Sequence, residues 1–131
     1  MFNDTLEKAM FLDLMEKMVE RCHQNSKNKG FWSGPENDNI PTKLSLIHSE
    51  VSEWLEAYRK GNPPCDKEIT VIDPKHPDGV RRITAEEEEA ADVFIRLADL
   101  CGRQGIDLAR VVLAKMSYNS TRPHMHGGKR V

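Results

Sequence analysis

Residues 44–60 read LSLIHSEVSEWLEAYRK, and residues 84–101 read TAEEEEAADVFIRLADLC. Each stretch holds two carboxylates spaced three residues apart, Glu50 with Glu53 in the first and Glu89 with Asp92 in the second. In a helix, side chains at this spacing lie on one face, about 5–6 Å apart. If the two stretches form helices that pack together, the four carboxylates converge.

The first stretch has the pattern of an amphipathic helix. Its apolar residues recur at spacings of three and four, which predicts a stripe buried in the core. Both glutamates belong to the neighbouring row, so we expect Glu50 and Glu53 at the edge of that core. The predicted stripe consists of Leu44, Ile47, Val51, Trp54 or Leu55, and Tyr58.

The second stretch separates polar from apolar positions even more clearly. Thr84 and Glu87 have the spacing of a capping box, which marks the start of a helix. Of the glutamates at 86–89, only Glu89 belongs to the row that we expect to face inward. The apolar positions are Val93, Phe94, Leu97, Leu100 and Cys101, and the polar row is Glu89, Asp92, Arg96 and Asp99.

The predicted site has more negative than positive charge. A carboxylate at the edge of a core needs a partner, because a buried unpaired charge is strongly disfavoured. Four acids against Arg96 leave an excess of negative charge, which a divalent cation would neutralise. Mg²⁺ takes oxygen ligands and commonly joins one or two carboxylates to the phosphates of a substrate. The sequence therefore predicts a Mg²⁺ site, with Mn²⁺ as the alternative ion.

Two further helices complete an all-α fold. Asn3 or Asp4 can cap a first helix that runs to about Gln24, and its broad apolar face predicts burial in a bundle or across a subunit interface. Asp107 can cap a last helix that runs to about Asn119. We expect a bundle of four to five helices.

The remaining segments are short enough to leave a single domain, residues 1–131. The proline-rich segment 61–83 separates the two acidic stretches, and its two short apolar runs predict an excursion in the form of a β-hairpin. Residues 123–131 form a tail.

Composition excludes some partners. The 131 residues have a net charge of −2, so no global field attracts nucleic acid or an anionic membrane. The three cysteines are odd in number and scattered, which is typical of reduced thiols. No stretch approaches the roughly 20 apolar residues of a membrane span, and the first residues lack the basic region of a signal peptide. We expect a soluble cytoplasmic protein.

Two other groups of residues suggest ligand contacts. Phe31 and Trp32 are adjacent in a polar loop, where they either anchor the loop or provide a stacking surface for a planar ligand such as a nucleobase. Lys115, Asn119 and Arg122 share one face if the last helix continues that far.

The acidic stretches resemble a known family. Glu50-Val-Ser-Glu53 followed by Glu89-Ala-Ala-Asp92 is similar to the ExxE…ExxD signature of MazG-like all-α nucleoside triphosphate pyrophosphohydrolases. The run from Lys115 to Arg122, with the pattern Lys-x-x-Tyr-Asn-x-x-Arg, resembles the closing helix of small single-domain members, including phage-type ones. One acid pair alone is a frequent chance match, whereas both pairs in order with this run are more specific.

This resemblance implies a Mg²⁺-dependent enzyme that converts nucleoside triphosphates to monophosphates and pyrophosphate, by attack of water at the α-phosphate. It also implies a homodimer or homotetramer in the cytoplasm, which would be the host cytoplasm for a phage-encoded protein. The aromatic loop and the similarity to phage-type members favour purine deoxynucleotides, although no residue fixes the base.

The resemblance also assigns roles by position. The metal-binding residues would be Glu50, Glu53, Glu89 and Asp92, with Glu50 and Glu53 catalytic and Glu50 orienting or deprotonating the water. The substrate-binding residues would be Lys115, Tyr118, Asn119 and Arg122 at phosphate or sugar, and Trp32 with Phe31 near the base. The sequence departs from the family pattern in the segment between the two acid pairs, because the 35 residues between Glu53 and Glu89 exceed the usual gap.

Other functions remain as alternatives. The broad apolar first helix would also suit a non-catalytic helical oligomerisation module. Nucleic-acid binding is a further alternative, because Lys115 to Arg130 holds four bases without an acid, although these bases can equally serve a mononucleotide. A ferritin-like di-iron bundle needs two Glu-x-x-His pairs, whereas the chain has one, Glu20 with His23.

Overall fold

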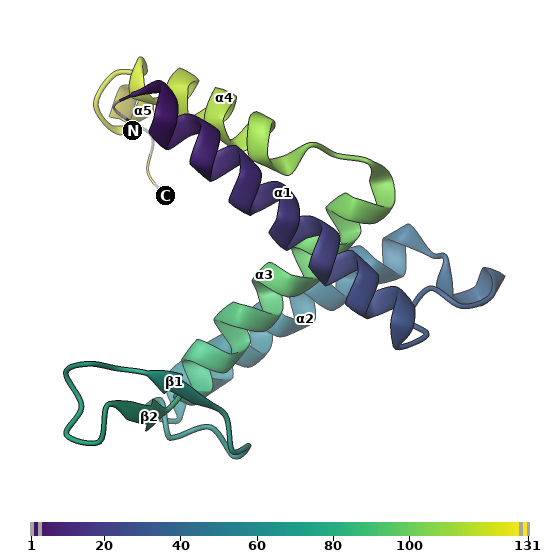
Figure 1. Ribbon diagram of the computed structural model, residues 1–131, viewed down its shortest axis with the longest axis vertical. Coiled ribbons are helices and arrows are strands. Elements are labelled where there is room, and N and C mark those ends of the chain that lie inside the picture. The colour runs from purple at the N-terminus through teal and green to yellow at the C-terminus, as the bar shows by residue number, and fades with distance from the viewer. Residues whose placement is uncertain (1, 3, 129, 131) are drawn as a thin grey trace.

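The protein is mainly helical, as the sequence predicts. The computed structural model describes residues 2, 4–128 and 130, and the ribbon in Figure 1 shows their arrangement. Within these residues the helices are α1 (Thr5–Asn28), the 3₁₀-helix η1 (Pro35–Asn37), α2 (Ile40–Arg59), α3 (Ala85–Gln104), α4 (Leu108–Ser120) and α5 (Met125–Gly128). The strands are β1 (Thr70–Ile72) and β2 (Val80–Arg82).

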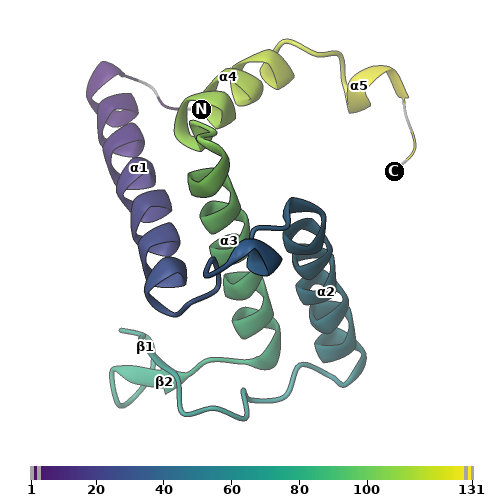
Figure 2. The same ribbon diagram turned by 90° about the vertical axis from the view of Figure 1, so that its right-hand side faces the viewer.

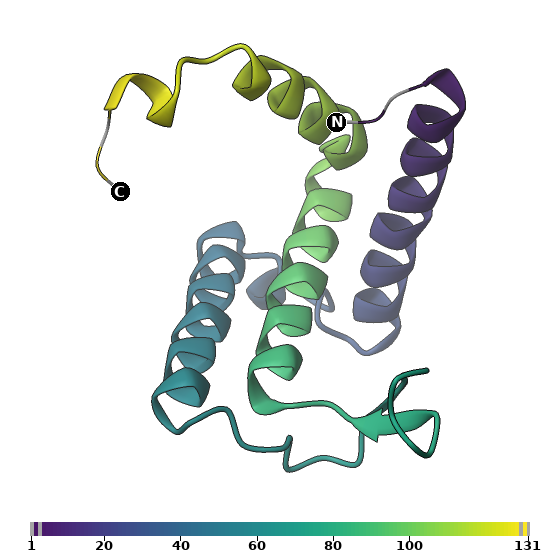
Figure 3. The same cartoon turned by 90° about the vertical axis from the view of Figure 1, so that its left-hand side faces the viewer.

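Helix α3 is the central element of the fold. Figures 2 and 3 show it between α1 on one side and α2 on the other, and both helices pack against it. Helix α4 packs along α1, and Figures 2 and 3 show the chain continuing through α5 on the side of α3 where α2 lies, beyond the N-terminal end of α2. The predicted packing of the two acidic helices is therefore confirmed.

Local capping signals set the beginnings of the helices. Thr84 and Glu87 form the predicted capping box of α3, in which each side chain accepts a hydrogen bond from the backbone N–H of the other residue. Asp4 caps α1 by accepting from the Glu7 N–H at 2.7 Å, whereas the alternative cap Asn3 lies outside the described residues. Asn39 caps α2 in the same manner.

Helix α1 is longer than predicted. It continues to Asn28, four residues beyond the expected end at Gln24. Residues 25–28 favour turns without excluding a helix, and the chain leaves the helical path only before Gly30, which has a φ of +84°.

The excursion 61–83 contains the predicted β-hairpin. Strands β1 and β2 pair antiparallel, with Val71 opposite Arg81. A backbone hydrogen bond from Cys65 N–H to the Ile83 carbonyl closes the base of the excursion next to the start of α3. The hairpin thus leaves the helical bundle at the same end as the N-terminus of α3.

The predicted apolar stripe of α2 is not buried within the chain. Leu44, Val51, Leu55 and Tyr58 are all exposed, whereas the buried residues of α2 are Glu50 and Ala57. The prediction that this stripe is buried in the core is wrong for the single chain, because α3 packs on the adjoining row instead.

Helix α1 also leaves an apolar row exposed. Its row of Leu6, Met10, Leu14 and Met18 faces solvent in the single chain. The chain exposes 9832 Å² in total, whereas a compact monomer of 15.0 kDa exposes about 7,000 Å². Much of the apolar surface that the periodicity predicts to be buried thus has no partner within one chain.

The buried core is small and lies around α3. Small side chains dominate it, which lets the helices approach closely. The buried apolar residues are Cys22, Ala57, Cys65, Ile83, Ala98, Leu100, Cys101 and Ala109. Over the part of the chain that is described, no helix is both long and apolar enough to cross a membrane.

The contact between α1 and α3 depends on Gly102. A Cβ atom at this position would lie 2.7 Å from the Cβ of His23, which belongs to α1 and cannot move without its backbone. We predict that Gly102→Ala lowers the free energy of unfolding by about 1–3 kcal/mol, because it overpacks this contact. Urea unfolding at matched protein concentration measures the change.

The control for this variant is Gln104→Ala, an exposed position on the same helix, where the expected change is within about 0.5 kcal/mol. Equal stability of Gly102→Ala and the wild-type protein would contradict the close approach of the two helices.

Candidate metal centre

Three of the four predicted acids meet between α2 and α3. Glu50 from α2 and Glu89 and Asp92 from α3 each place a carboxylate oxygen within 4.8 Å of the other two. Glu50 is only 6% exposed, and the two residues of α3 are half-buried. The i, i+3 spacing on α3 and the packing of α2 beside it produce this cluster.

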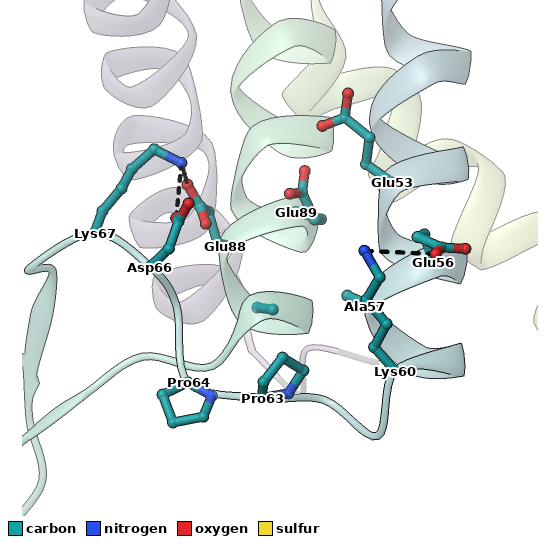
Figure 4. Close-up of a pocket in the computed structure, with 11 residues that line it drawn as sticks. Glu53, Glu56, Ala57, Lys60, Pro63, Pro64, Asp66, Lys67, Glu88 and Glu89 are labelled. Atoms are coloured by element: carbon teal, nitrogen blue, oxygen red, sulfur yellow. Dashed lines mark hydrogen bonds and ion pairs between the residues drawn. The ribbon is translucent and has the colours of Figure 1, made fainter.

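The fourth acid, Glu53, lies on the wall of a neighbouring cavity of about 410 Å³. Figure 4 shows its carboxylate facing Glu89 across this cavity. The side chain itself is exposed. Glu53 therefore borders the cluster from the solvent side.

Positive charge in the cluster comes from Arg96. Its Nε donates to Glu50 Oε1 at 2.5 Å, so Arg96 compensates the most deeply buried of the three acids. Glu89 Oε2 is buried and has no hydrogen-bond partner among the described residues. An orphaned carboxylate oxygen is costly in a protein interior unless a cation or proton compensates it.

The electrostatics of the cluster favour protons when no metal is present. Burial raises the pKa of Glu89 to about 7, and the hydrogen bond to Glu50 and the charges of Glu53, Glu50 and Asp92 add to this effect. Burial also raises the pKa of Asp92, with further contributions from the charges of Glu50 and Glu88. A divalent cation would replace these protons, because it stabilises the ionised carboxylates.

The donor atoms fit a hard cation. All three side chains offer carboxylate oxygens, which suit Mg²⁺ and Mn²⁺. The orphaned oxygen of Glu89 supplies a free ligand atom in a buried position. The residues present are therefore compatible with the predicted ion.

A further buried acid was not predicted. Glu88 is 9% exposed, although sequence reasoning assigned only Glu89 of that run to the interior. Glu88 accepts hydrogen bonds from the Cys65 thiol at 2.9 Å and from the Lys67 ammonium. Both partners come from the excursion, so no helical periodicity could have indicated this burial.

The aromatic loop contacts α3 at Asp99, which lies closer to the C-terminal end of the helix than the acidic cluster does. Trp32 Nε1 donates to Asp99 Oδ1 at 2.9 Å, and Asp99 also bonds His23 Nδ1 at 2.7 Å. The Lys43 ammonium lies 4.5 Å from the centre of the Trp32 ring. These contacts hold the indole in place, as expected if Trp32 anchors the loop.

A cavity of about 260 Å³ opens beside this tryptophan. Phe31, Trp32 and Lys43 line it together with Arg96, the same residue that holds Glu50. Phe31 itself is exposed. Through Arg96, the aromatic cavity and the acidic cluster adjoin each other along α3.

The predicted basic residues lie at the end of α4, but the helix stops at Ser120, so Arg122 lies beyond it and the expected helical face extends only to Asn119. The Lys115 ammonium lies 4.7 Å and the Arg122 guanidinium 6.0 Å from the Tyr118 ring, and all three are near Asn119 in sequence. Helix α4 packs along α1, and Figures 2 and 3 show its C-terminal end extending to the side on which α2 lies, beyond the N-terminal end of α2 and not along it. Among the described residues, no hydrogen bond or ion pair joins these four residues to the acidic cluster.

The structure thus unites Glu50, Glu89 and Asp92, places Glu53 at their border and keeps the basic face apart. Comparison with known proteins finds no matching family model, no similar curated protein and no similar solved structure.

The raised pKa values make a prediction about stability without metal. Because the folded protein holds a proton on Glu89 up to about pH 7, compared with an ordinary pKa of 4.5, it binds more protons than the unfolded chain between these values. This contribution to stability is complete below the ordinary pKa and is lost as the pH rises through 7. In the presence of a chelator, we expect the free energy of unfolding to fall from about pH 5 to about pH 8.

Glu89→Gln should reduce this fall, because glutamine does not titrate, whereas Glu56→Gln on the exposed side of α2 should retain it. Denaturant unfolding at several pH values measures both slopes. An unchanged slope in Glu89→Gln would show that Glu89 ionises normally in the folded protein.

Proposed function

We propose that the protein is a Mg²⁺-dependent nucleoside triphosphate pyrophosphohydrolase. The observation that carries this proposal is the meeting of Glu50, Glu89 and Asp92 around a buried carboxylate oxygen that has no partner among the described residues. Such an arrangement lowers stability unless a cation or a proton compensates the carboxylate oxygen. The resemblance of both acid pairs to the MazG-like signature supports the same reading of the site.

A purely structural module would not need this cluster. Helical oligomerisation requires apolar faces, which the chain has, but gains nothing from buried acids that oppose one another. Nucleic-acid binding would use the basic face of α4 and leave the acids unexplained. The cluster therefore favours an enzyme over both alternatives.

The proposed reaction is hydrolysis at the α-phosphorus. The oxygen of water forms a bond to the α-phosphorus, the bond from this phosphorus to the α–β bridging oxygen breaks, and pyrophosphate leaves while the water loses its protons to a base and to solvent. Bound Mg²⁺ would neutralise the charge that develops on the phosphate oxygens.

The chain's own residues would position the reactants. Glu50, Glu53, Glu89 and Asp92 would hold the metal ions, and Arg96 fixes the orientation of Glu50 through its Nε bond. Glu50 and Glu53 are the proposed catalytic carboxylates, with Glu50 orienting or deprotonating the water. The exposure of Glu53 at the cavity gives the substrate access to the cluster.

The aromatic cavity would receive the base. Trp32 and Phe31 line a space next to Arg96, one helical turn along α3 from Asp92. Aromatic side chains bind planar rings by stacking. The proposed substrate is a deoxynucleoside triphosphate, and a purine base is favoured.

The proposed assembly is a homodimer or homotetramer. Apolar rows on α1 and α2 are exposed, and the surface of one chain exceeds that of a compact monomer by about 2,800 Å². An obligate interface buries about 2,000–5,000 Å² or more over both partners together, so this excess is large enough to supply one. The basic face of α4 does not reach the acids of its own chain, so Lys115, Tyr118, Asn119 and Arg122 would complete the site of another subunit.

The catalytic proposal predicts that loss of an acid of the site reduces activity, whereas loss of an acid outside it does not. Glu53→Gln and Asp92→Asn should each reduce pyrophosphate release from a nucleoside triphosphate with Mg²⁺ by at least about a hundredfold, because each removes a charged metal ligand while the fold is retained. Glu56→Gln is the matched control, since Glu56 lies on the same helix but turns away from Glu89 (Figure 4) and should retain activity.

Pyrophosphate release is measured for the eight common ribo- and deoxynucleoside triphosphates, and circular dichroism monitors the fold. Full turnover in Glu53→Gln and Asp92→Asn would refute the assignment of these residues to the metal.

The assembly proposal predicts a particle of at least twice the 15.0 kDa of one chain by light scattering. Leu14→Glu should shift the protein toward monomers, because it places a charge in the exposed apolar row of α1. Glu20→Lys, a charge change on a polar position of the same helix, should leave the mass unchanged. A monomeric wild-type protein at micromolar concentration would refute the assembly.

A further inference from the structure

The excursion 61–83 forms one wall of the acidic cavity. Helices α2 and α3 provide two sides of this cavity through Glu53 and Glu89, and the excursion closes it with Pro63, Pro64, Asp66 and Lys67. Figure 4 shows Lys67 and Asp66 on this wall, with the Lys67 side chain rising beside Glu88.

Several contacts fix Lys67 in this place. Its ammonium bonds Glu88, and Asp66 Oδ1 lies 3.5 Å from the same nitrogen. Its backbone N–H donates to the sulfur of Cys65 at 3.3 Å, and Cys65 is only 1% exposed. The backbone that carries Lys67 is thus anchored to α3.

The Lys67 ammonium remains able to bind a further anion. An ammonium group has three donors, and the side chain of Lys67 is 61% exposed despite its bond to Glu88. The positive charge also reaches the cluster, since Lys67 partly offsets the rise in the pKa of Asp92. Lys67 is therefore a cation of the same chain that lines the cavity shared with Glu53 and Glu89.

The order of the two cavities and the acids along α3 indicates how the substrate would be oriented. The cavity beside Lys67 lies at Glu88 and Glu89, the metal-binding acids follow, and the aromatic cavity lies at Arg96 and Asp99. Ten residues of helix separate Glu89 from Asp99, which is about 15 Å along the axis. This span is comparable to that of an extended nucleoside triphosphate.

We propose that Lys67 is a substrate-binding residue that contacts the β- and γ-phosphates of the nucleoside triphosphate, which makes the excursion 61–83 a part of the site. The base then lies at the aromatic cavity and the α-phosphate at the acids between the two ends. This inference rests on the proposed function and adds the direction of the substrate and the residue that recognises its pyrophosphate end. Glu88 is the positioning residue for Lys67.

The test compares a ligand that carries the β- and γ-phosphates with one that lacks them. The probes are dATP with a methylene group between the α- and β-phosphorus atoms, which resists hydrolysis at that bond, and dAMP. Calorimetry with Mg²⁺ measures both affinities for the wild-type protein, Lys67→Gln and Lys67→Arg. Glutamine retains a donor for Glu88 without the charge, so the anchor of the excursion is preserved.

We expect Lys67→Gln to weaken binding of the triphosphate analogue by about tenfold and to leave dAMP unchanged, while Lys67→Arg retains most of the affinity. Lys75→Ala, an exposed lysine in the turn of the same hairpin, should bind both ligands as the wild-type protein does.

Equal affinity for the analogue in Lys67→Gln and the wild-type protein would overturn the inference while leaving the proposed function intact. Equal weakening of both ligands would also overturn it, because that result indicates a structural role for Lys67. A wild-type protein that binds neither ligand with Mg²⁺ would overturn the proposed function together with the inference.

Discussion

The packing of α2 against α3 is the constraint on which the rest of the structure depends. Ala57 of α2 is buried, and so small a side chain allows the two helices to approach closely. The same contact brings Glu50 beside Glu89 and Asp92, where one guanidinium, that of Arg96, compensates one of three acids. The fold therefore contains a local electrostatic conflict at its centre, and a bound cation is the simplest way to resolve it.

The sequence predicted the elements and their pairing well, because these follow from local signals. The capping box of Thr84 and Glu87 and the i, i+3 spacing of the acids act within one helix, and the structure shows the expected result. The face of α2 was predicted incorrectly for the single chain. Periodicity indicates that Leu44, Val51 and their neighbours avoid water, but it does not indicate whether the same chain or a second one covers them.

Contacts between distant segments account for what the sequence could not predict. Glu88 is buried because Cys65 and Lys67 of the excursion bond it, and Trp32 is held by Asp99, which lies 67 residues away in sequence. Neither contact has a periodic signal. These two regions place the Lys67 ammonium on one side of the acids and an aromatic cavity on the other. The excursion and the loop thus make the two ends of the site chemically different, which the helices alone would not do.

The central claim is that the acids between α2 and α3 bind a divalent cation, and titration of Mn²⁺ into the metal-free protein tests it most directly. Calorimetry at about pH 8, above the pKa of Glu89, should show binding to the wild-type protein and a loss of at least about tenfold in affinity for Glu89→Gln. Absence of Mn²⁺ binding in the wild-type protein, or the same affinity in both proteins, would contradict the account.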